Sequence, residues 1–244
     1  RIAGMVLVST VSLSCVSAYA QEDTCILEEI VVTAQKRQES LQDVPISVSV
    51  LTGDKFVEAG IDNLDDLALY VPNFSKGESG AGTIIQIRGI ATGANAGFEQ
   101  SVVMYMDDIS LSRSPLARMP LMDLERVEVL RGPQNVLFGK NSIAGAISLV
   151  TAKPTDEAQG SMSLRYEPDD GDTEGTVVLS GPLSDNIAGR LAVRYADYGG
   201  CAYNSFLQRV VEQREEMAVR GRVRWAAGDD GELCFRFEDN AVEG

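Results

Sequence analysis

The feature that most constrains the fold is a series of five segments after Lys153-Pro154 in which apolar and polar residues alternate. In the fourth segment, Met217, Val223 and Trp225 fall on one face, while arginines occupy the other. A period of two is typical of a β-strand whose two faces meet different surroundings. Helix signals are missing from this region. The predicted strands are 159–167, 174–182, 187–199, 216–227 and 232–240.

Such alternation fits either a soluble β-sandwich or an outer-membrane barrel, and two details favour the barrel. Short connections (183–186, 228–231) alternate with longer ones (168–173, 200–215), as periplasmic turns alternate with external loops. All nine basic residues after Lys153 are arginine, whose rigid fork suits carboxylates paired in a lumen. The predicted lumen-facing arginines are Arg190, Arg194, Arg220, Arg222 and Arg224.

Residues 44–155 carry a mixed pattern that predicts an α+β domain. Period two indicates some of its elements, and capping residues or closing glycines indicate the others. The predicted strands are 46–51, 84–88, 102–106, 126–130 and 146–150. The predicted helices are 54–59, 64–70 and 134–138, with a helical turn at 121–124.

The first twenty residues have the pattern of an export signal. An apolar run from Ile2 to Val16 ends in Ala18-x-Ala20, the small-residue pattern of a signal-peptidase site. A buried N-terminal strand or helix is the alternative. Export leaves Cys25, Cys201 and Cys234 in an oxidising compartment. A Cys201–Cys234 bridge is conceivable, but burial as small apolar residues is the expected state.

Residues 21–43 are expected to form a polar linker around one short apolar island, Ile30 to Ala34. Charged residues flank the island on both sides, and its β-branched residues favour an exposed strand that adds to a partner's sheet edge. The alternative is a first strand of the following domain.

Composition excludes several functions. The chain has no histidine, so a Ser-His-Asp triad or a histidine-ligated metal cannot be built from it. A net charge of −15 argues against nucleic acid as a partner. The Gly132 to Asn141 segment has the wrong spacing for a phosphate loop. The acidic run at 169–172 lacks the calcium-loop pattern, and no carboxylate pair indicates an enzyme. We expect no catalytic residue, metal or cofactor.

Four segments, taken in order, resemble the N-terminal part of a TonB-dependent outer-membrane receptor. Glu28-Glu29-Ile30-Val31-Val32-Thr33-Ala34 resembles the TonB box, and 43–50 (DVPISVSV) resembles the opening of the plug. Ile87-Arg88-Gly89 resembles the end of its middle strand. Residues 124–133 (LERVEVLRGP), with 137–140 (LFGK) and 145–147 (GAI), resemble its closing section. The resemblance covers roughly 28–155.

The resemblance implies a fold and a set of partners. The fold is an α+β plug, a mixed sheet of about four strands with short helices, inside a 22-stranded transmembrane β-barrel. The implied domains are a signal peptide (1–20), a linker with the TonB box (21–43), the plug (44–155) and the first barrel strands (156–244). The inner-membrane TonB complex would grip the box of a monomer embedded in the outer-membrane lipid of a Gram-negative bacterium.

The resemblance also implies an ionic lock between plug and barrel. In the family, arginines at two Arg-Gly corners engage barrel glutamates, and here these positions are Arg88 and Arg131. The alternation and charge sign suggest in addition that Glu125 and Glu128 face the arginines of the barrel wall.

The resemblance also implies ligand contact at two loops, through Thr92, Gly93, Asn95, Phe98, Ser112 and Arg113. The implied function is active import of a scarce ligand, a ferric siderophore before cobalamin or a glycan. The alternative is a soluble periplasmic binding or signalling module. About ninety residues follow the plug, too few for 22 strands, so we expect both ends to be truncated.

Overall fold

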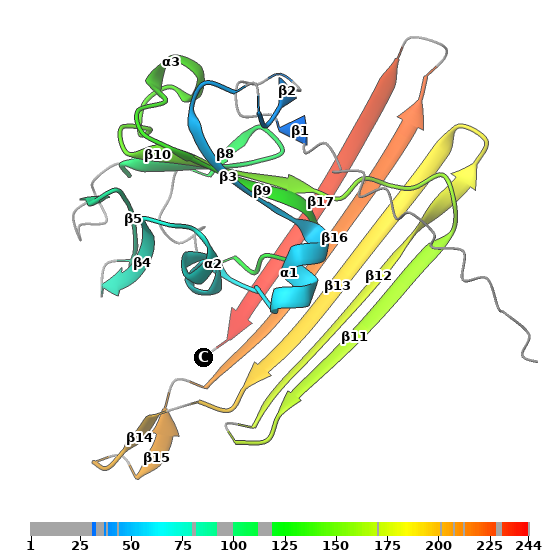
Figure 1. Ribbon diagram of the computed structural model, residues 1–244. Helices are drawn as coiled ribbons and strands as arrows, with labels where there is room; N and C mark the ends of the chain where they lie inside the picture. The colour runs from blue at the N-terminus through cyan, green and yellow to red at the C-terminus, as the bar shows by residue number, and fades with distance from the viewer. Residues whose placement is uncertain are drawn as a thin grey trace, which may run out of the picture.

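The computed structural model describes residues 31–32, 37, 39–42, 44–79, 82–91, 100–111, 119–169, 171–200, 202–206, 208–211, 213–227 and 231–243. Segment 1–20, interpreted as an export signal, lies outside these residues. Two main bodies are present (Figure 1), an N-terminal domain (residues 44–151) and an antiparallel sheet formed by the second half of the chain.

A mixed five-stranded sheet forms the centre of the N-terminal domain, one strand more than expected. Its order is β3-β9-β10-β7-β8, in which only β10 and β7 run parallel. The additional strand, β8, is a three-residue edge strand that pairs with β7 across the Asp107-Asp108 turn. The bounds are β3 (Ser47–Thr52), β7 (Val102–Met106), β8 (Ile109–Leu111), β9 (Leu124–Arg131) and β10 (Gly145–Thr151).

Two short helices follow β3 at the positions that the sequence predicts. Helix α1 (Gly53–Ala59) ends at Gly60, whose φ of 62° suits glycine. Helix α2 (Leu64–Tyr70) begins after Asn63, whose side-chain oxygen accepts hydrogen bonds from the backbone N–H groups of Asp65 (2.7 Å) and Asp66 (3.1 Å). A third helix, α3 (Asn135–Phe138), is a single turn between β9 and β10.

Part of the N-terminal domain differs from the elements predicted from the sequence. A separate sheet contains β4 (Phe74–Ser79), β5 (Gly82–Ile87) and β6 (Ile90–Ala91), of which only β5 was expected. The predicted helical turn at 121–124 is wrong, because residues 121–123 form no helical turn and Leu124 already begins β9. Its backbone instead bonds to neighbouring segments, as when Leu121 N–H donates to the Asp62 carbonyl (2.8 Å).

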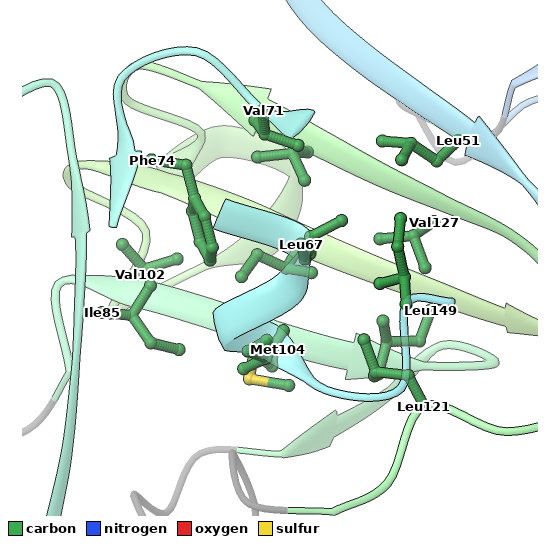
Figure 2. Packing of buried hydrophobic residues seen from close by; sticks show 14 of the residues in the cluster. Leu51, Leu67, Val71, Phe74, Ile85, Val102, Met104, Leu121, Val127 and Leu149 are labelled. Carbon is green, nitrogen blue, oxygen red and sulfur yellow. The ribbon is translucent and has the colours of Figure 1, made fainter. Parts of the chain in front are cut away.

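The main hydrophobic core lies between the helices and one face of the five-stranded sheet. Leu67 of α2 stands in its middle (Figure 2), with Phe74, Met104 and Val127 around it. Full burial of side chains of this size contributes about 1.5–3 kcal/mol each, which makes this cluster the main source of the domain's stability.

A second, smaller cluster lies on the other face of the sheet. Its buried members come from β7, β9, β10, α3 and the segment before β3: Val32, Val44, Val103, Leu130, Phe138 and Ala146. Val32 belongs to β1 (Val31–Val32), which pairs antiparallel with β2 (Glu39–Ser40).

The second half of the chain forms an antiparallel meander of long strands, here called the wall. Its order, β11-β12-β13-β16-β17, follows the chain, and a small β14–β15 hairpin projects between β13 and β16. The predicted strands match these closely. The bounds are β11 (Gln159–Glu167), β12 (Asp172–Ser184), β13 (Ile187–Tyr198), β14 (Ala202–Asn204), β15 (Arg209–Val211), β16 (Arg214–Ala226) and β17 (Glu232–Glu243).

The two faces of the wall differ as the alternation predicts. One face carries exposed large apolar side chains, including Met162, Leu164, Trp225, Phe235 and Phe237. The opposite face carries the arginines, and the N-terminal domain lies against it (Figure 1). Among the helices of the described residues, none is long and apolar enough to cross a membrane.

Candidate functional site: the contact between the N-terminal domain and the wall

The wall approaches the N-terminal domain through small and cationic residues. Ala188, Ala192, Ala196 and Ala218 are buried on the inner face, and the arginines stand between them along the same strands. Small side chains bring the backbones close, and long guanidinium groups then reach acceptors on the domain. Each of these acceptors lies at one end of a strand or helix of the domain.

Asp123, directly before β9, receives the first of these arginines. Arg190 of β13 donates from Nε to both carboxylate oxygens (3.0 and 2.9 Å) and from Nη2 to Oδ1 (2.5 Å). Both side chains are largely buried. The Asp123 backbone has a φ of 50°, a conformation that Asp and Asn tolerate better than other non-glycine residues. The tight turn at Asp123 therefore aims its carboxylate at the wall.

Asp107, in the turn between β7 and β8, is the centre of a larger network. Its carboxylate accepts from the Thr151 N–H (2.9 Å) and hydroxyl (2.6 Å) and from Arg236 Nη1 (2.6 Å). Arg222 Nη1 donates to the Thr151 hydroxyl (2.6 Å) and carbonyl (2.9 Å). The ends of β7 and β10 are thereby joined to β16 and β17.

The environment of Asp107 keeps its carboxyl group ionised. Burial alone would raise its pKa. The hydrogen bonds from Thr151, the charge of Arg222 and the hydrogen bond from Arg236 outweigh burial, and the pKa lies below its ordinary value.

Arg220 of β16 reaches the domain between these two carboxylates. It donates to the Met122 carbonyl (2.5 Å) and lies 3.7 Å from the Met106 sulfur, while its other contact is Glu238 of β17 (2.8 Å). The side chain is buried. It therefore pairs with a wall carboxylate while it satisfies a backbone oxygen of the domain.

The remaining contact lies between α1 and α2, at Asp62. Arg165 of β11 pairs with Asp62 and with Glu174 of β12. Arg194 continues the series, bonding to Glu174 (3.0 Å) and to Glu216 (3.1 Å). Predicted lumen-facing Arg194 thus pairs within the wall. Burial raises the pKa of Asp62, and Arg165 offsets only part of this effect.

A cavity of about 290 Å³ adjoins this contact. The α1–α2 corner forms one side of it, and the ends of β11, β12 and β13 form the other. The lining residues are Gly60, Asp62, Asn63, Asp66, Arg165, Glu167, Asp172, Thr173, Glu174 and Tyr198.

The glutamates predicted to meet the wall arginines, Glu125 and Glu128, both pair with Arg126 of their own strand. Glu128 is fully buried within the sheet, and its Oε1 accepts from Arg126 Nε of the same strand (2.8 Å). Glu125 also pairs with Arg126. The carboxylates that do meet the wall belong to Asp62, Asp107 and Asp123, with Asp156 of the following linker pairing with Arg224.

A sequence signal for these aspartates existed. Asp62 precedes a helix cap, Asp107 opens a turn and Asp123 precedes a strand, and each position lies at the end of an element. The glutamates lie inside a strand, so their direction depends on which face of the sheet they occupy.

The two Arg-Gly corners lie next to one another. Arg88 Nη1 lies 3.5 Å from the point at which a Cβ on Gly132 would stand, and Arg131 Nη1 donates to the Pro72 carbonyl (3.3 Å). The Arg131 Nε is buried and has no partner in the described part of the chain. Within the same residues, neither guanidinium pairs with a carboxylate. Their role as an ionic lock remains a proposal.

The TonB-box segment is described only at Val31 and Val32. Val32 is 0% exposed and belongs to the second cluster, so the expectation of an exposed strand is wrong for this residue. β-pairing with β2 and the loss of apolar surface hold it on the domain. The other box residues, Glu28, Glu29, Ile30, Thr33 and Ala34, lie outside the described residues, as do the predicted ligand-loop residues Thr92, Gly93, Asn95, Phe98, Ser112 and Arg113.

One cysteine takes part in the contact network, because Arg222 Nε donates a hydrogen bond to Cys234 Sγ (3.1 Å). Cys234 is a free, exposed thiol, which contradicts the expected burial, and Cys201 lies outside the described residues. No group of three or more potential metal ligands occurs among the described residues.

Comparison with known proteins agrees with this architecture. The family model described as the TonB-dependent Receptor Plug Domain matches residues 40–146. The Ferrioxamine B receptor of Salmonella typhimurium is 32% identical over 162 residues, which are 64% of this chain and 23% of that protein. The Iron-regulated outer membrane virulence protein of Vibrio cholerae is 27% identical over 188 residues, 70% of this chain and 28% of that protein.

Solved structures show the same fold. The ferric yersiniabactin uptake receptor FyuA of Yersinia pestis superposes with a TM-score of 0.74 at 24% identity, over 81% of this chain and 32% of that one. The pyoverdine outer membrane receptor FpvA of Pseudomonas aeruginosa gives 0.72 at 20% identity, over 86% and 30%. The chain spans about a quarter of the length of the curated relatives it matches. The N-terminal domain is a plug seated on barrel strands, and the chain belongs to the TonB-dependent receptors of the Gram-negative outer membrane.

Proposed function

We propose that this receptor imports a ferric siderophore across the outer membrane, with energy from the inner-membrane TonB complex. The observation that carries the proposal is a plug domain seated against the arginine face of a wall whose other face is apolar. The names of its relatives supply the ligand class, because they include receptors for ferrioxamine B, ferric yersiniabactin and pyoverdine.

The soluble periplasmic module is not favoured. Exposed large apolar side chains cover the outer face of the wall along all five strands, and a water-soluble domain rarely exposes so continuous an apolar surface. Lipid is the natural neighbour of such a face. The arrangement has the features of a transporter, and the family is not one of enzymes.

Energy coupling is assigned to residues 28–34. A β-branched segment such as Ile30 to Thr33 can add to the edge of a partner's sheet through backbone hydrogen bonds. Since Val32 is buried on the plug, engagement of TonB requires this strand to leave the second cluster. The contacts between plug and barrel then determine how much of the plug moves together with this strand.

The test is uptake of radiolabelled iron by a deletion strain that carries the receptor. Deletion of 30–33 should abolish energised uptake of a ferric siderophore and leave ligand binding to membranes intact. Deletion of four linker residues outside the box, 21–24, is the matched control and should leave uptake unchanged. Normal uptake without 30–33 contradicts the assignment of the box. Growth on hydroxamate, catecholate and mixed siderophores, with cobalamin and glycans for comparison, identifies the ligand class.

A further inference from the structure

Five arginines form a cross on the inner face of the wall, with Arg222 at its centre. Residues two apart on a strand share a face, so Arg220 and Arg224 flank Arg222 along β16. Across the sheet, Arg222 is registered with Arg190 of β13 and with Arg236 of β17. All four of its nearest neighbours on this face are therefore arginines. Strands β13 and β17 already pair with the two edges of β16, so no further barrel strand can lie beside Arg222.

This arrangement opposes the pairing of the wall strands. Side chains directly opposite each other in an antiparallel pair have Cβ atoms about 4.5–5.5 Å apart, and like charges at this spacing are destabilising. Glu238 of β17 pairs with Arg220 (2.8 Å), and Asp156 of the linker before the wall pairs with Arg224. Within the described residues, the wall provides no carboxylate to the three arginines that share one row across the strands: Arg190, Arg222 and Arg236.

The plug supplies the charges that this row lacks. Asp123 accepts three hydrogen bonds from Arg190, and the Asp107 carboxylate lies 2.6 Å from Nη1 of Arg236 and 3.7 Å from Nη1 of Arg222. The end of β10 adds a hydroxyl and a carbonyl oxygen to Arg222. The three arginine side chains are at most 18% exposed, so water contributes little to their solvation. The plug is thus the main source of counter-ions for this part of the wall.

These acceptors come together only when the plug is folded. Asp107 lies in the β7–β8 turn, Asp123 precedes β9 and Thr151 ends β10. The parallel pairing of β10 with β7 and its antiparallel pairing with β9 bring the three positions to one end of the plug sheet. Thr151 also fixes Asp107 through its N–H (2.9 Å) and its hydroxyl (2.6 Å). An unfolded N-terminal half would carry the same charges, but not at the spacing of the arginine row.

We propose that the folded plug is the counter-ion on which wall strands β13, β16 and β17 assemble. The wall of this receptor forms around a docked plug, because its row of arginines is neutralised from the plug side. The inference goes beyond the proposed function: it concerns how the receptor is built, and it depends neither on the imported ligand nor on energy coupling.

The test follows barrel formation and plug docking separately while the full-length receptor refolds from urea into detergent micelles. The faster gel mobility of the unheated protein reports the barrel, and cleavage by trypsin reports the plug. Asp107→Asn with Asp123→Asn removes both plug charges, and asparagine tolerates the positive φ at both positions. The fraction of formed barrel should fall about ten-fold at low ionic strength, because the arginine row is then unscreened. It should recover at about 1 M salt, where the Debye length is about 3 Å.

Neutralising the row should remove the need for the plug charges. Addition of Arg190→Gln, Arg222→Gln and Arg236→Gln to the double variant should restore barrel formation, although the ion pairs between plug and wall remain absent. Asp54→Asn with Asp108→Asn is the matched control, since it removes two exposed plug charges and Asp108 also has a positive φ. This control should form the barrel as the parent does.

Two results would overturn the proposal. One is parental barrel formation in the Asp107 and Asp123 double variant with only the plug open to trypsin, because the aspartates would then merely anchor the plug. The other is a barrel defect that persists both at high salt and after neutralisation of the row, because charge would then not be its cause.

Discussion

Arg190 and Asp123 form a bidentate ion pair, with Nε 2.9 Å from Oδ2 and Nη2 2.5 Å from Oδ1, that joins wall strand β13 to the start of plug strand β9. Both residues lie at fixed points: Arg190 between buried alanines, and Asp123 in a turn with positive φ. The two sides of this contact carry charges opposite to those that the family resemblance implied. The family resemblance implied plug arginines and barrel glutamates, whereas the described contacts join plug aspartates to wall arginines.

Loss of this pair should loosen the plug. Asp123→Asn keeps a residue that tolerates positive φ and removes only the charge, so Arg190 is left buried without its counter-ion. The expected cost is about 3–5 kcal/mol. Limited proteolysis of the receptor in detergent should release plug fragments at lower urea than in the parent. Arg224→Gln, at an exposed pair, should cost about 1 kcal/mol or less. Equal effects of the two substitutions would contradict the ranking by burial.

The Asp107 network predicts a dependence of stability on acid. The pKa of this carboxyl is lower in the folded state than in the unfolded chain, so its stabilisation is present above the unfolded pKa, about 4. It disappears as the pH falls through the lower, folded pKa. Asparagine suits the φ of 45° at this position. Asp107→Asn should lower the free energy of unfolding by about 2 kcal/mol at pH 7 and should weaken its decrease at acidic pH. Urea denaturation between pH 2 and 7 measures both, and an unchanged decrease at acidic pH would count against Asp107 as its source.

Gly145 at the start of β10 should not tolerate a side chain. A Cβ there would stand 2.3 Å from the Leu130 carbonyl oxygen and 2.9 Å from Ile87 Cδ1. Gly145→Ala should therefore destabilise the plug by about 1–3 kcal/mol, as overpacking does. Gly77→Ala in β4 is the matched control, because nothing lies within 4 Å of its Cβ position. Thermal unfolding of the two variants should differ, and similar melting temperatures would show that the strand shifts freely.

Val32 should hold the box segment on the plug through apolar contact. Val32→Ala removes two methyl groups from a closed cluster and should cost about 1–2 kcal/mol of docking. The expected result is faster protease cleavage within 33–38, with the plug itself unchanged in stability. Val136→Ala, at a residue 97% exposed, gives the baseline. If both variants are cleaved at the parental rate, burial of Val32 does not limit access to the segment.

Much of the fold could be predicted because local patterns determine it. Asn63 and Gly60 mark the ends of helices, and the alternation around Arg220 and Trp225 marks a strand with two unlike faces. These signals depend on the period of the backbone and on φ preferences, and both act within a few residues. The prediction of a helical turn at 121–124 failed because the backbone of this segment forms hydrogen bonds with segments distant in sequence. A local sequence pattern does not indicate such bonds.

The candidate site was less predictable for a related reason. The sequence indicated that the arginines share a face, but not which acids they meet. Glu128 and Asp123 are equally plausible by charge, and only the direction of each side chain separates them. That direction follows from the pairing of β9 with β3 and β10, which buries Glu128 beside Arg126.

By itself, the sequence determined the strand and helix periods, the arginine face, the order of the family segments and the absence of histidine. The tertiary structure decided which carboxylates bind the wall and that Val32 is buried. The physical reason is that period and turn chemistry act locally. Ion pairing and burial depend on which distant segments the fold brings within a few ångströms of each other.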